Sequence, residues 1–325
     1  MYVIPGSSEP GIDLSGNPWY NQFTKVNKHI HICDYIGRCI LVDRSDIEKM
    51  VRQHLMERIS QDAAGSASVC ASCGGKRHYI VATNWKMNMS TKETRSFLQA
   101  MKQVRIPSNE TVIIFPPYPY LSEFRDSLRY EQIAYGAQDC AKEEKGAYTG
   151  EVSGAMIADM GCSYTLIGHS ERRSYYGDTP ELCGKKTLAA LKSQLTPVLC
   201  IGETLDERKL DMYKAVLKSQ LDAVYKEIKG DMAKLIIAYE PVWAIGTGVI
   251  PTMEQIRDTM AYIHGVLASY EGVGEKVPPI LYGGSVKPDN AAEIAAVDHV
   301  GGFLIGGAGL KVDSFTKIMN CVAAD

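Results

Sequence analysis

Glu240 stands where a carboxylate can act as a catalytic base. It ends a run of apolar residues and precedes a segment that begins with proline and ends in glycine: Pro241, Val242, Trp243, Ala244, Ile245, Gly246, Thr247 and Gly248. A loop of this kind can close as a lid that excludes water and protects a reactive intermediate beside the base. An exposed glutamate at the start of an ordinary loop is the simpler alternative, so the assignment needs further groups nearby.

His169 is a second candidate, between the apolar segment 164–168 and the polar segment 170–173. A histidine that ends a strand and begins a helix faces the N–H groups of the helix start, whose positive field disfavours the protonated ring. We therefore expect a lowered pKa and a neutral imidazole that donates a hydrogen bond to a carbonyl and then to an enediolate. A purely structural histidine is the alternative.

Lys86 is a third candidate, within the segment 84–88, NWKMN. Alternate residues of a strand point the same way, so Asn84 and Lys86 are expected to face the same end of a sheet. A lysine there can stabilise an oxyanion and attract a phosphate. The alternative, a solvated surface lysine, is disfavoured by the apolar neighbours Trp85 and Met87.

Glycine-rich turns at 246–248, 283–285 and 306–307 favour an anion site. Glycine lets backbone N–H groups converge on a phosphate with no side chain in the way. One such turn is weak support, because turns need glycine anyway. Three turns that each follow an apolar run indicate a phosphate-binding rim.

The elements that must position these residues begin near residue 78. Short apolar runs alternate with longer polar segments of helical spacing, and continuous apolar runs are typical of parallel strands covered by helices. Eight such units over residues 78–325 match the roughly 250 residues of a closed (β/α)8 barrel better than a doubly wound open sheet. The expected strands are 78–85, 111–115, 133–138, 164–168, 197–201, 234–239, 278–282 and 301–305.

Residues 1–77 differ in texture and are expected to form an N-terminal extension. Residues 1–22 look irregular, and 28–42 have the composition of a short strand or two. A possible capping box opens an amphipathic helix at about 45–60, and a flexible linker is expected at about 62–76. We place the domain boundary near residue 77, before the barrel of residues 78–325.

The composition limits the partners. A formal net charge of −3 gives no electrostatic reason to expect nucleic acid or an anionic membrane surface, and no apolar run reaches the ~20 residues that span a bilayer. Nine cysteines, an odd number without regular spacing, favour a reducing compartment such as the cytoplasm.

Four segments together resemble signature segments of the triosephosphate isomerase family. They are NWKMN at 84–88, IGHSERR at 167–173, AYEPVWAIGTG at 238–248 and YGGSV at 282–286. The resemblance implies a (β/α)8 TIM barrel that interconverts dihydroxyacetone phosphate and D-glyceraldehyde 3-phosphate in glycolysis and gluconeogenesis. It implies no cofactor and no metal.

The resemblance also implies roles for individual residues. Glu240 would move the proton between the two carbons, and a neutral His169 would polarise the carbonyl, a pairing well known in this family. Lys86 would stabilise negative charge, Asn84 would position the substrate, and Glu171 would anchor Lys86.

Around the substrate, the lid and the glycine turns would act together. The lid spans the loop from Pro241 to Gly248, with Trp243 moving on it and Tyr282 latching it when closed. The phosphate would be held by main-chain N–H groups of Gly246, Ser285, Gly306 and Gly307.

The family is dimeric, so the resemblance implies a homodimer in which the loop 146–151 inserts into the partner and Thr149 lies nearest the catalytic groups. Four positions depart from the usual pattern. Val249 replaces a common Lys, Asp139 replaces Asn, Gly154 stands where Pro is common, and Gly309 stands where Ser is common. None of them removes a catalytic group.

Alternatives stay open at this point. The barrel could be an inactive scaffold or binding subunit, or another phosphate-binding barrel such as an aldolase or epimerase. The extension could be a targeting segment for an organelle, a tether that docks onto a partner as in bacterial microcompartments, or a small module.

Overall fold

The structure, a computed structural model, describes residues 29–33, 39–43, 77–128, 132–245 and 249–323. The chain divides into two units, residues 1–67 and 68–325, and each is described by itself. The helix expected at about 45–60 and the linker at about 62–76 lie outside the described residues. The domain boundary near residue 77 stays a prediction.

The first unit contains the strand pair expected between residues 28 and 42. Strands β1 (His29–Cys33) and β2 (Cys39–Asp43) run antiparallel, with His29 opposite Asp43 and Cys33 opposite Cys39.

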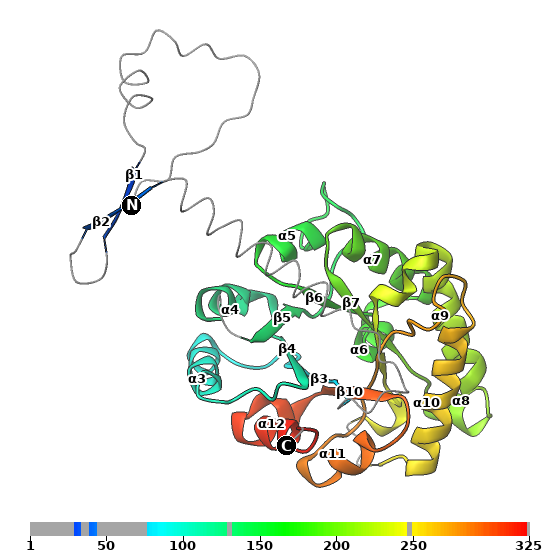
Figure 1. The fold of residues 1–325 in the computed structure, drawn as a ribbon. Helices are drawn as coiled ribbons and strands as arrows, with labels where there is room; N and C mark the ends of the chain where they lie inside the picture. The colour runs from blue at the N-terminus through cyan, green and yellow to red at the C-terminus, as the bar shows by residue number, and fades with distance from the viewer. Residues whose placement is uncertain (1–28, 34–38, 44–76, 129–131, 246–248, 324–325) are drawn as a thin grey trace. The chain divides into compact units, whose positions relative to one another are not determined.

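The second unit is a closed barrel of eight parallel strands, as the alternating pattern predicted (Figure 1). The observed strands differ from the expected ones by no more than two residues at either end. They are β3 (Tyr79–Asn84), β4 (Glu110–Phe115), β5 (Ile133–Ala137), β6 (Tyr164–Ile167), β7 (Thr196–Ile201), β8 (Ile236–Tyr239), β9 (Ile280–Tyr282) and β10 (Val300–Ile305).

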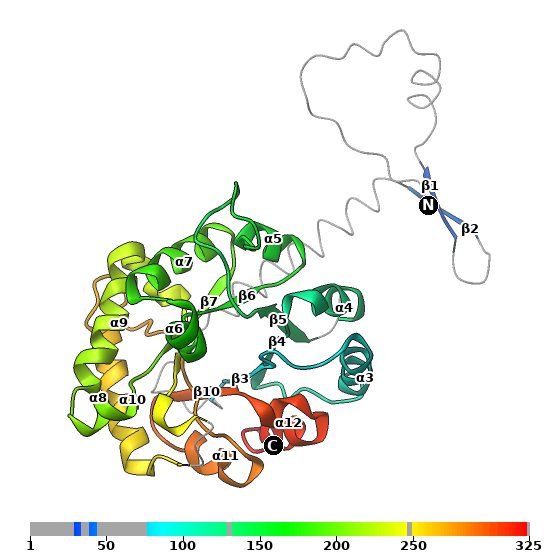
Figure 2. The ribbon, with the colours of Figure 1, turned by 180° about the vertical axis from the view of Figure 1, so that it is seen from behind.

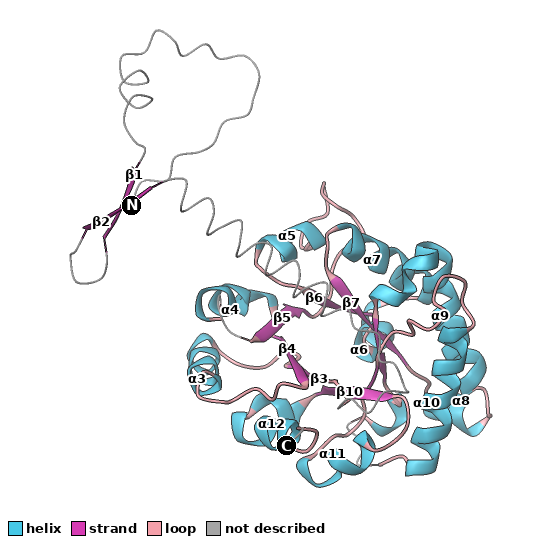
Figure 3. Ribbon diagram, viewed as in Figure 1, coloured by secondary structure: helices cyan, strands magenta, loops and turns pink. Residues whose placement is uncertain are grey.

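Helices surround these strands, and Figure 3 shows the strands inside the helical ring. Seen from behind in Figure 2, α12 lies beside α3, against which it packs. The α-helices are α3 (Thr91–Met101), α4 (Leu121–Ser127), α5 (Gly154–Asp159), α6 (Ser170–Tyr176), α7 (Pro180–Lys192), α8 (Leu205–Lys209), α9 (Tyr213–Ile228), α10 (Met253–Ala268), α11 (Pro288–Ala295) and α12 (Val312–Asn320). The 3₁₀ turns are η1 (Tyr118–Tyr120), η2 (Lys229–Lys234), η3 (Val242–Ala244) and η4 (Gly307–Leu310).

Local sequence signals set where several helices begin. Ser90, Thr204 and Thr252 are N-caps, and each forms a capping box with the residue three positions later. The cap oxygen accepts a main-chain N–H that the helix leaves unpaired, so these helices start at a defined residue after each strand.

The barrel closes where β10 pairs with both β3 and β9. Gly302 lies where the register between β10 and β9 shifts, and its φ is +139°. On the other side of β10, a Cβ on Gly302 would lie 1.9 Å from the main-chain oxygen of Ile80 in β3. A side chain would therefore push β10 away from β3. Only glycine permits both the backbone conformation and the close approach that closes the ring.

Two layers of apolar side chains fill the second unit. Successive strand residues alternate between them: Val112 and Ile114 belong to the larger cluster, Ile113 and Phe115 to the smaller. Since side chains alternate across a strand, the smaller cluster fills the barrel interior and the larger one lies between strands and helices. No helix in the described part of the chain is long and apolar enough to cross a bilayer.

Glu110 is an exception to this apolar packing. It is the first residue of β4, its side chain is 7% exposed, and neither carboxylate oxygen has a hydrogen-bond partner among the described residues. Burial raises the pKa of Glu110 to about 8. An ionised carboxylate without a partner is costly in such a place, so the folded protein keeps the proton up to that pH.

We predict that Glu110→Gln stabilises the protein at high pH. Between the unfolded pKa near 4.5 and the folded value of about 8, the folded state binds more protons than the unfolded state, so stability falls as pH rises. The amide removes that loss, and the melting temperature of the variant should exceed that of the wild type by ~3 °C or more at pH 9 but not at pH 5. Exposed Glu275→Gln is the control. An equal shift at both pH values would contradict the prediction.

Candidate functional site

The predicted site residues follow three different strands at their carboxyl ends. Asn84 is the last residue of β3, Glu240 follows β8, and His169 follows β6 as the N-cap of α6. All three are buried: Asn84 and His169 are 5% exposed and Glu240 is 2% exposed. Parallel strands in a barrel direct these ends to one rim, so residues far apart in sequence meet there.

His169 and Glu240 form a buried pair. His169 Nε2 lies 3.0 Å from Glu240 Oε1, and the N–H of Ser170 donates to Glu240 Oε2 at 2.9 Å. Burial alone would raise the pKa of Glu240, but the imidazole, the Ser170 N–H and the Lys86 ammonium together hold that pKa below its usual value. The carboxylate is therefore ionised and fixed at both oxygens.

The pKa of His169 differs from the sequence prediction. The N–H of Glu171 donates to His169 Nδ1 at 3.3 Å, which is the expected contact with the helix start. Burial and the charge of Lys86 lower the pKa of His169, yet the carboxylate of Glu240 outweighs them and raises it. The sequence could not reveal this partner, which stands 71 residues further along the chain.

Lys86 reaches the site for a different reason than strand alternation. β3 ends at Asn84, and Lys86 has φ of +53°, which is uncommon for a residue with a side chain. The turn is held by Asn84 Oδ1, which accepts the Lys86 N–H at 2.9 Å, and by Gln138, whose Nε2 donates to the Lys86 oxygen at 3.0 Å. Lys86 Nζ then donates to Glu171 Oε1 at 2.6 Å.

Two of the three glycine turns lie beside these groups. A Cβ on Gly283 would be 3.0 Å from Glu240 Cγ, and a Cβ on Gly306 would be 3.9 Å from Lys86 Cε. Gly307 is exposed at the start of η4, and Ser285 is half-buried, with its hydroxyl donating to Ala244 O at 3.4 Å. Gly246, Thr247 and Gly248 lie outside the described residues.

The described start of the predicted lid is attached to a carboxylate that sequence reasoning missed. Trp243 Nε1 donates to Glu203 Oε1 at 2.7 Å, and the Tyr239 hydroxyl donates to the same oxygen at 3.0 Å. Glu203 is fully buried, and burial raises its pKa. A weaker signal was present, since Glu203 lies two residues beyond the end of β7, whereas Glu240 directly follows β8. The hydroxyl of Tyr282, the predicted latch, is buried without a hydrogen-bond partner among the described residues.

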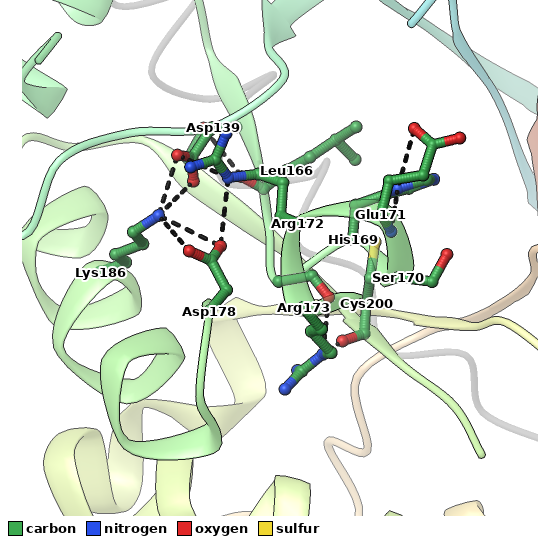
Figure 4. A network of polar contacts seen from close by, with 12 residues as sticks. Asp139, Leu166, His169, Ser170, Glu171, Arg172, Arg173, Asp178, Lys186 and Cys200 are labelled. Carbon is green, nitrogen blue, oxygen red and sulfur yellow. Dashed lines mark hydrogen bonds and ion pairs between the residues drawn. The ribbon is translucent and has the colours of Figure 1, made fainter. Parts of the chain in front are cut away.

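Behind the site, α6 is attached to a cluster of four charged groups (Figure 4). Lys186 Nζ contacts both oxygens of Asp139 at 2.8–2.9 Å and both oxygens of Asp178 at 2.9–3.1 Å. Arg172 Nε lies 2.9 Å from Asp139 and 3.2 Å from Asp178. Asp139, Asp178 and Lys186 are all less than 10% exposed, so two buried anions are neutralised by two cations.

The N-cap of α6 and the first residues of the helix therefore contact groups on two opposite sides of it. His169, Ser170 and Glu171 face Glu240 and Lys86, whereas Arg172 faces the charged cluster. Arg173 donates to the main-chain oxygens of Gly168 at 2.7 Å and Cys200 at 2.8 Å, which ties the ends of β6 and β7 together. The short helix is held from both sides.

Outside this group, Thr149 is exposed on the loop between β5 and α5 and makes none of the contacts above. Within the described residues, no group of three or more His, Cys, Asp or Glu side chains is arranged to hold a metal ion.

Comparison with known proteins identifies a family for the barrel. The family model described as Triosephosphate isomerase matches residues 79–322. A triosephosphate isomerase of Xanthomonas campestris is 42% identical over 250 residues, which cover 76% of this chain and 99% of the relative. Those of Cupriavidus necator and Endomicrobium trichonymphae are 43% and 44% identical over 246 residues, which cover 75% of this chain and 99% and 98% of the relatives.

We predict that Lys186→Met lowers the free energy of unfolding by about 3–5 kcal/mol, because it leaves two buried carboxylates with one cation. Urea-induced unfolding measures the change. Exposed Lys185→Met on the same helix is the matched control and should change stability by less than ~0.5 kcal/mol. Equal effects of the two substitutions would show that the cluster contributes nothing specific.

Proposed function

This chain belongs to the triosephosphate isomerase family and is an isomerase, and on that premise we propose that it interconverts dihydroxyacetone phosphate and D-glyceraldehyde 3-phosphate through an enediolate. The observation that carries this proposal is the buried pair of His169 Nε2 and Glu240 Oε1, 3.0 Å apart, beside Lys86 and two glycine turns. Proton transfer between adjacent carbons needs one base, one group that polarises the carbonyl, and an anchor for the phosphate.

We assign the base to Glu240. The carboxylate is ionised, nearly free of water and aimed at the imidazole, so a substrate that enters between them lies against both groups. Substrate binding removes the hydrogen bond to His169, and closure removes the remaining water. Both changes raise the basicity of the carboxylate when it must accept a proton.

We assign carbonyl polarisation to His169. A substrate between the two side chains breaks the direct contact with Glu240 that raises the pKa of the imidazole. Burial and the Glu171 N–H on Nδ1 then favour the neutral ring, which donates its Nε2–H to the substrate oxygens. Neutral histidine is thus a property of the occupied site in this proposal.

Lys86 stabilises the negative charge of the enediolate and phosphate, and Asn84 fixes the turn that directs it. Glu171, 2.6 Å from Lys86 Nζ, anchors the ammonium. The phosphate binds N–H groups of Ser285, Gly306 and Gly307, together with Gly246 on the lid. The approach of Gly306 to Lys86 supports this arrangement, because one phosphate can reach both.

The lid is the segment from Pro241 to Gly248. Its described start is held by the Trp243–Glu203 hydrogen bond, which supports an open position in the free protein. The buried, unpartnered hydroxyl of Tyr282 supports its role as the latch, because closure would supply the missing partner. Excluding water also protects the enediolate phosphate from elimination.

We further propose a homodimer in which Thr149 approaches the partner's site. Large apolar side chains stay exposed in the single chain around the site: Met87 is 96% exposed, Tyr175 77%, Tyr176 69% and Tyr148 49%. Met87 adjoins Lys86, both α6 tyrosines follow His169, and Tyr148 adjoins Thr149. A second copy that covers them would bury substantial apolar area. We place the enzyme in glycolysis and gluconeogenesis in the cytoplasm, acting without a cofactor.

We predict that Glu240→Asp lowers kcat at least ~100-fold with a smaller change in KM, because one methylene less withdraws the base from the carbon it serves. A coupled isomerase assay measures turnover, and exchange of the substrate proton with D₂O measures the base directly. The control is Glu254→Asp, exposed on α10, with kinetics like the wild type. Near-normal exchange in Glu240→Asp would refute the assigned base.

We predict that Met87→Lys converts the dimer to monomers and lowers kcat, because it places a charge in a contact that excludes water. Sedimentation velocity measures the oligomeric state. The control is Leu210→Lys. Leu210 is an apolar residue that is 69% exposed at the end of α8, and its substitution should leave the dimer intact. A wild type that sediments as a monomer at micromolar concentration would overturn the dimer proposal.

A further inference from the structure

Gly309 lies in η4, the turn that begins at Gly307 directly after Gly306, the two predicted phosphate-binding glycines. A Cβ built on Gly309 would lie 1.9 Å from Thr83 Oγ1, 2.6 Å from Thr83 Cβ and 3.5 Å from Thr83 Cγ2. Gly309 does not belong to the glycines with positive φ, so its φ angle does not require glycine. The side chain of Thr83 is therefore what requires glycine at 309.

The main chain of Thr83 is held in the sheet between β10 and β4, so its Cβ has little freedom to move away from Gly309. Thr83 is fully buried in β3, directly before Asn84, and lies opposite Ile305 in the pairing of β3 with β10. Its hydroxyl is buried without a hydrogen-bond partner among the described residues. Thr83 therefore affects η4 through the volume of its side chain and not through a hydrogen bond.

A displacement at 309 would reach the phosphate turn. The N–H of Gly309 donates to Gly306 O at 2.9 Å, so the ends of this short turn move together. Gly306 in turn lies near Lys86, since a Cβ there would be 3.9 Å from Lys86 Cε. Close-packed contacts transmit such shifts because the interior has little free volume.

We propose that Thr83 and Gly309 form a complementary size pair, in which Thr83 is a positioning residue that sets the place of the Gly306–Gly307 turn against Lys86. This inference rests on the proposed binding of a triose phosphate at that turn. It also explains the departure at 309: a serine there is incompatible with the threonine at 83, so each residue determines what the other position accepts.

The test is a double-mutant cycle. Gly309→Ser should raise KM for glyceraldehyde 3-phosphate and the inhibition constant of inorganic phosphate at least ~10-fold, with a smaller change in kcat. Only removal of the Thr83 Cβ relieves the contact, so Thr83→Gly combined with Gly309→Ser should restore both constants to within ~3-fold of the wild type. Thr83→Val combined with Gly309→Ser should not restore them, because valine keeps the Cβ and the volume and removes only the hydroxyl.

A replacement variant at position 309 and the activities of the wild type and Glu240→Asp decide the remaining outcomes. If Gly309→Ser does not fold, Gly309→Ala takes its place, and recovery of folding and phosphate inhibition in the double variant supports the pair. Normal constants in folded Gly309→Ser, or no rescue by Thr83→Gly, would overturn it while the wild type stays active. An inactive wild type, or normal turnover in Glu240→Asp, would instead overturn the proposed function.

Discussion

Closure of β10 onto β3 is the constraint on which the site depends. It brings Ile305 opposite Thr83 and thereby sets Gly306 beside Lys86, although these residues come from opposite ends of the barrel sequence. In the same way β8 pairs with both β7 and β9, which places Glu240 near Gly283. An open sheet would spread these strand ends along one edge. Gly302 makes the closure possible by letting β10 approach the main chain of Ile80.

Much of this architecture could be predicted from local sequence, and the reason is physical. Strands buried on both faces must be continuously apolar, so runs such as Val198–Ile201 stand out, and helix starts need caps such as Ser90 or Thr252. What local sequence could not supply are the effects of distant partners. The direction of Lys86 depends on Gln138, and the pKa of His169 depends on Glu240. Glu203 was missed although it, too, lies just beyond the end of a strand.

Helix α6 shows how charge is managed around the site. Its N-cap His169 contacts Glu240, its second residue Glu171 contacts Lys86, and Arg172 joins Asp139, Asp178 and Lys186 behind them. Buried ion pairs contribute little net stability, but a missing partner is costly, so the cluster specifies one position of the helix strongly. Because α6 has only 7 residues, that position also fixes His169 and Glu171. The ion pairs of Arg172 on one side of α6 thus help to hold His169 and Glu171 in position at the candidate site on the other side.

The departures from the family pattern gain meaning only from their neighbours. Asp139 adds an anion, and Lys186 and Arg172 neutralise it together with Asp178. Proline suits the first position of a helix such as α5, yet a Cβ on Gly154 would lie 2.6 Å from Ser193 Oγ, so the proline ring has no room. Gly309 is small because Thr83 is large. Nothing in the structure explains Val249. A glycine at position 309 therefore does not make η4 more mobile, because the side chain of Thr83 in the adjacent strand β3 occupies the space that a larger residue would take.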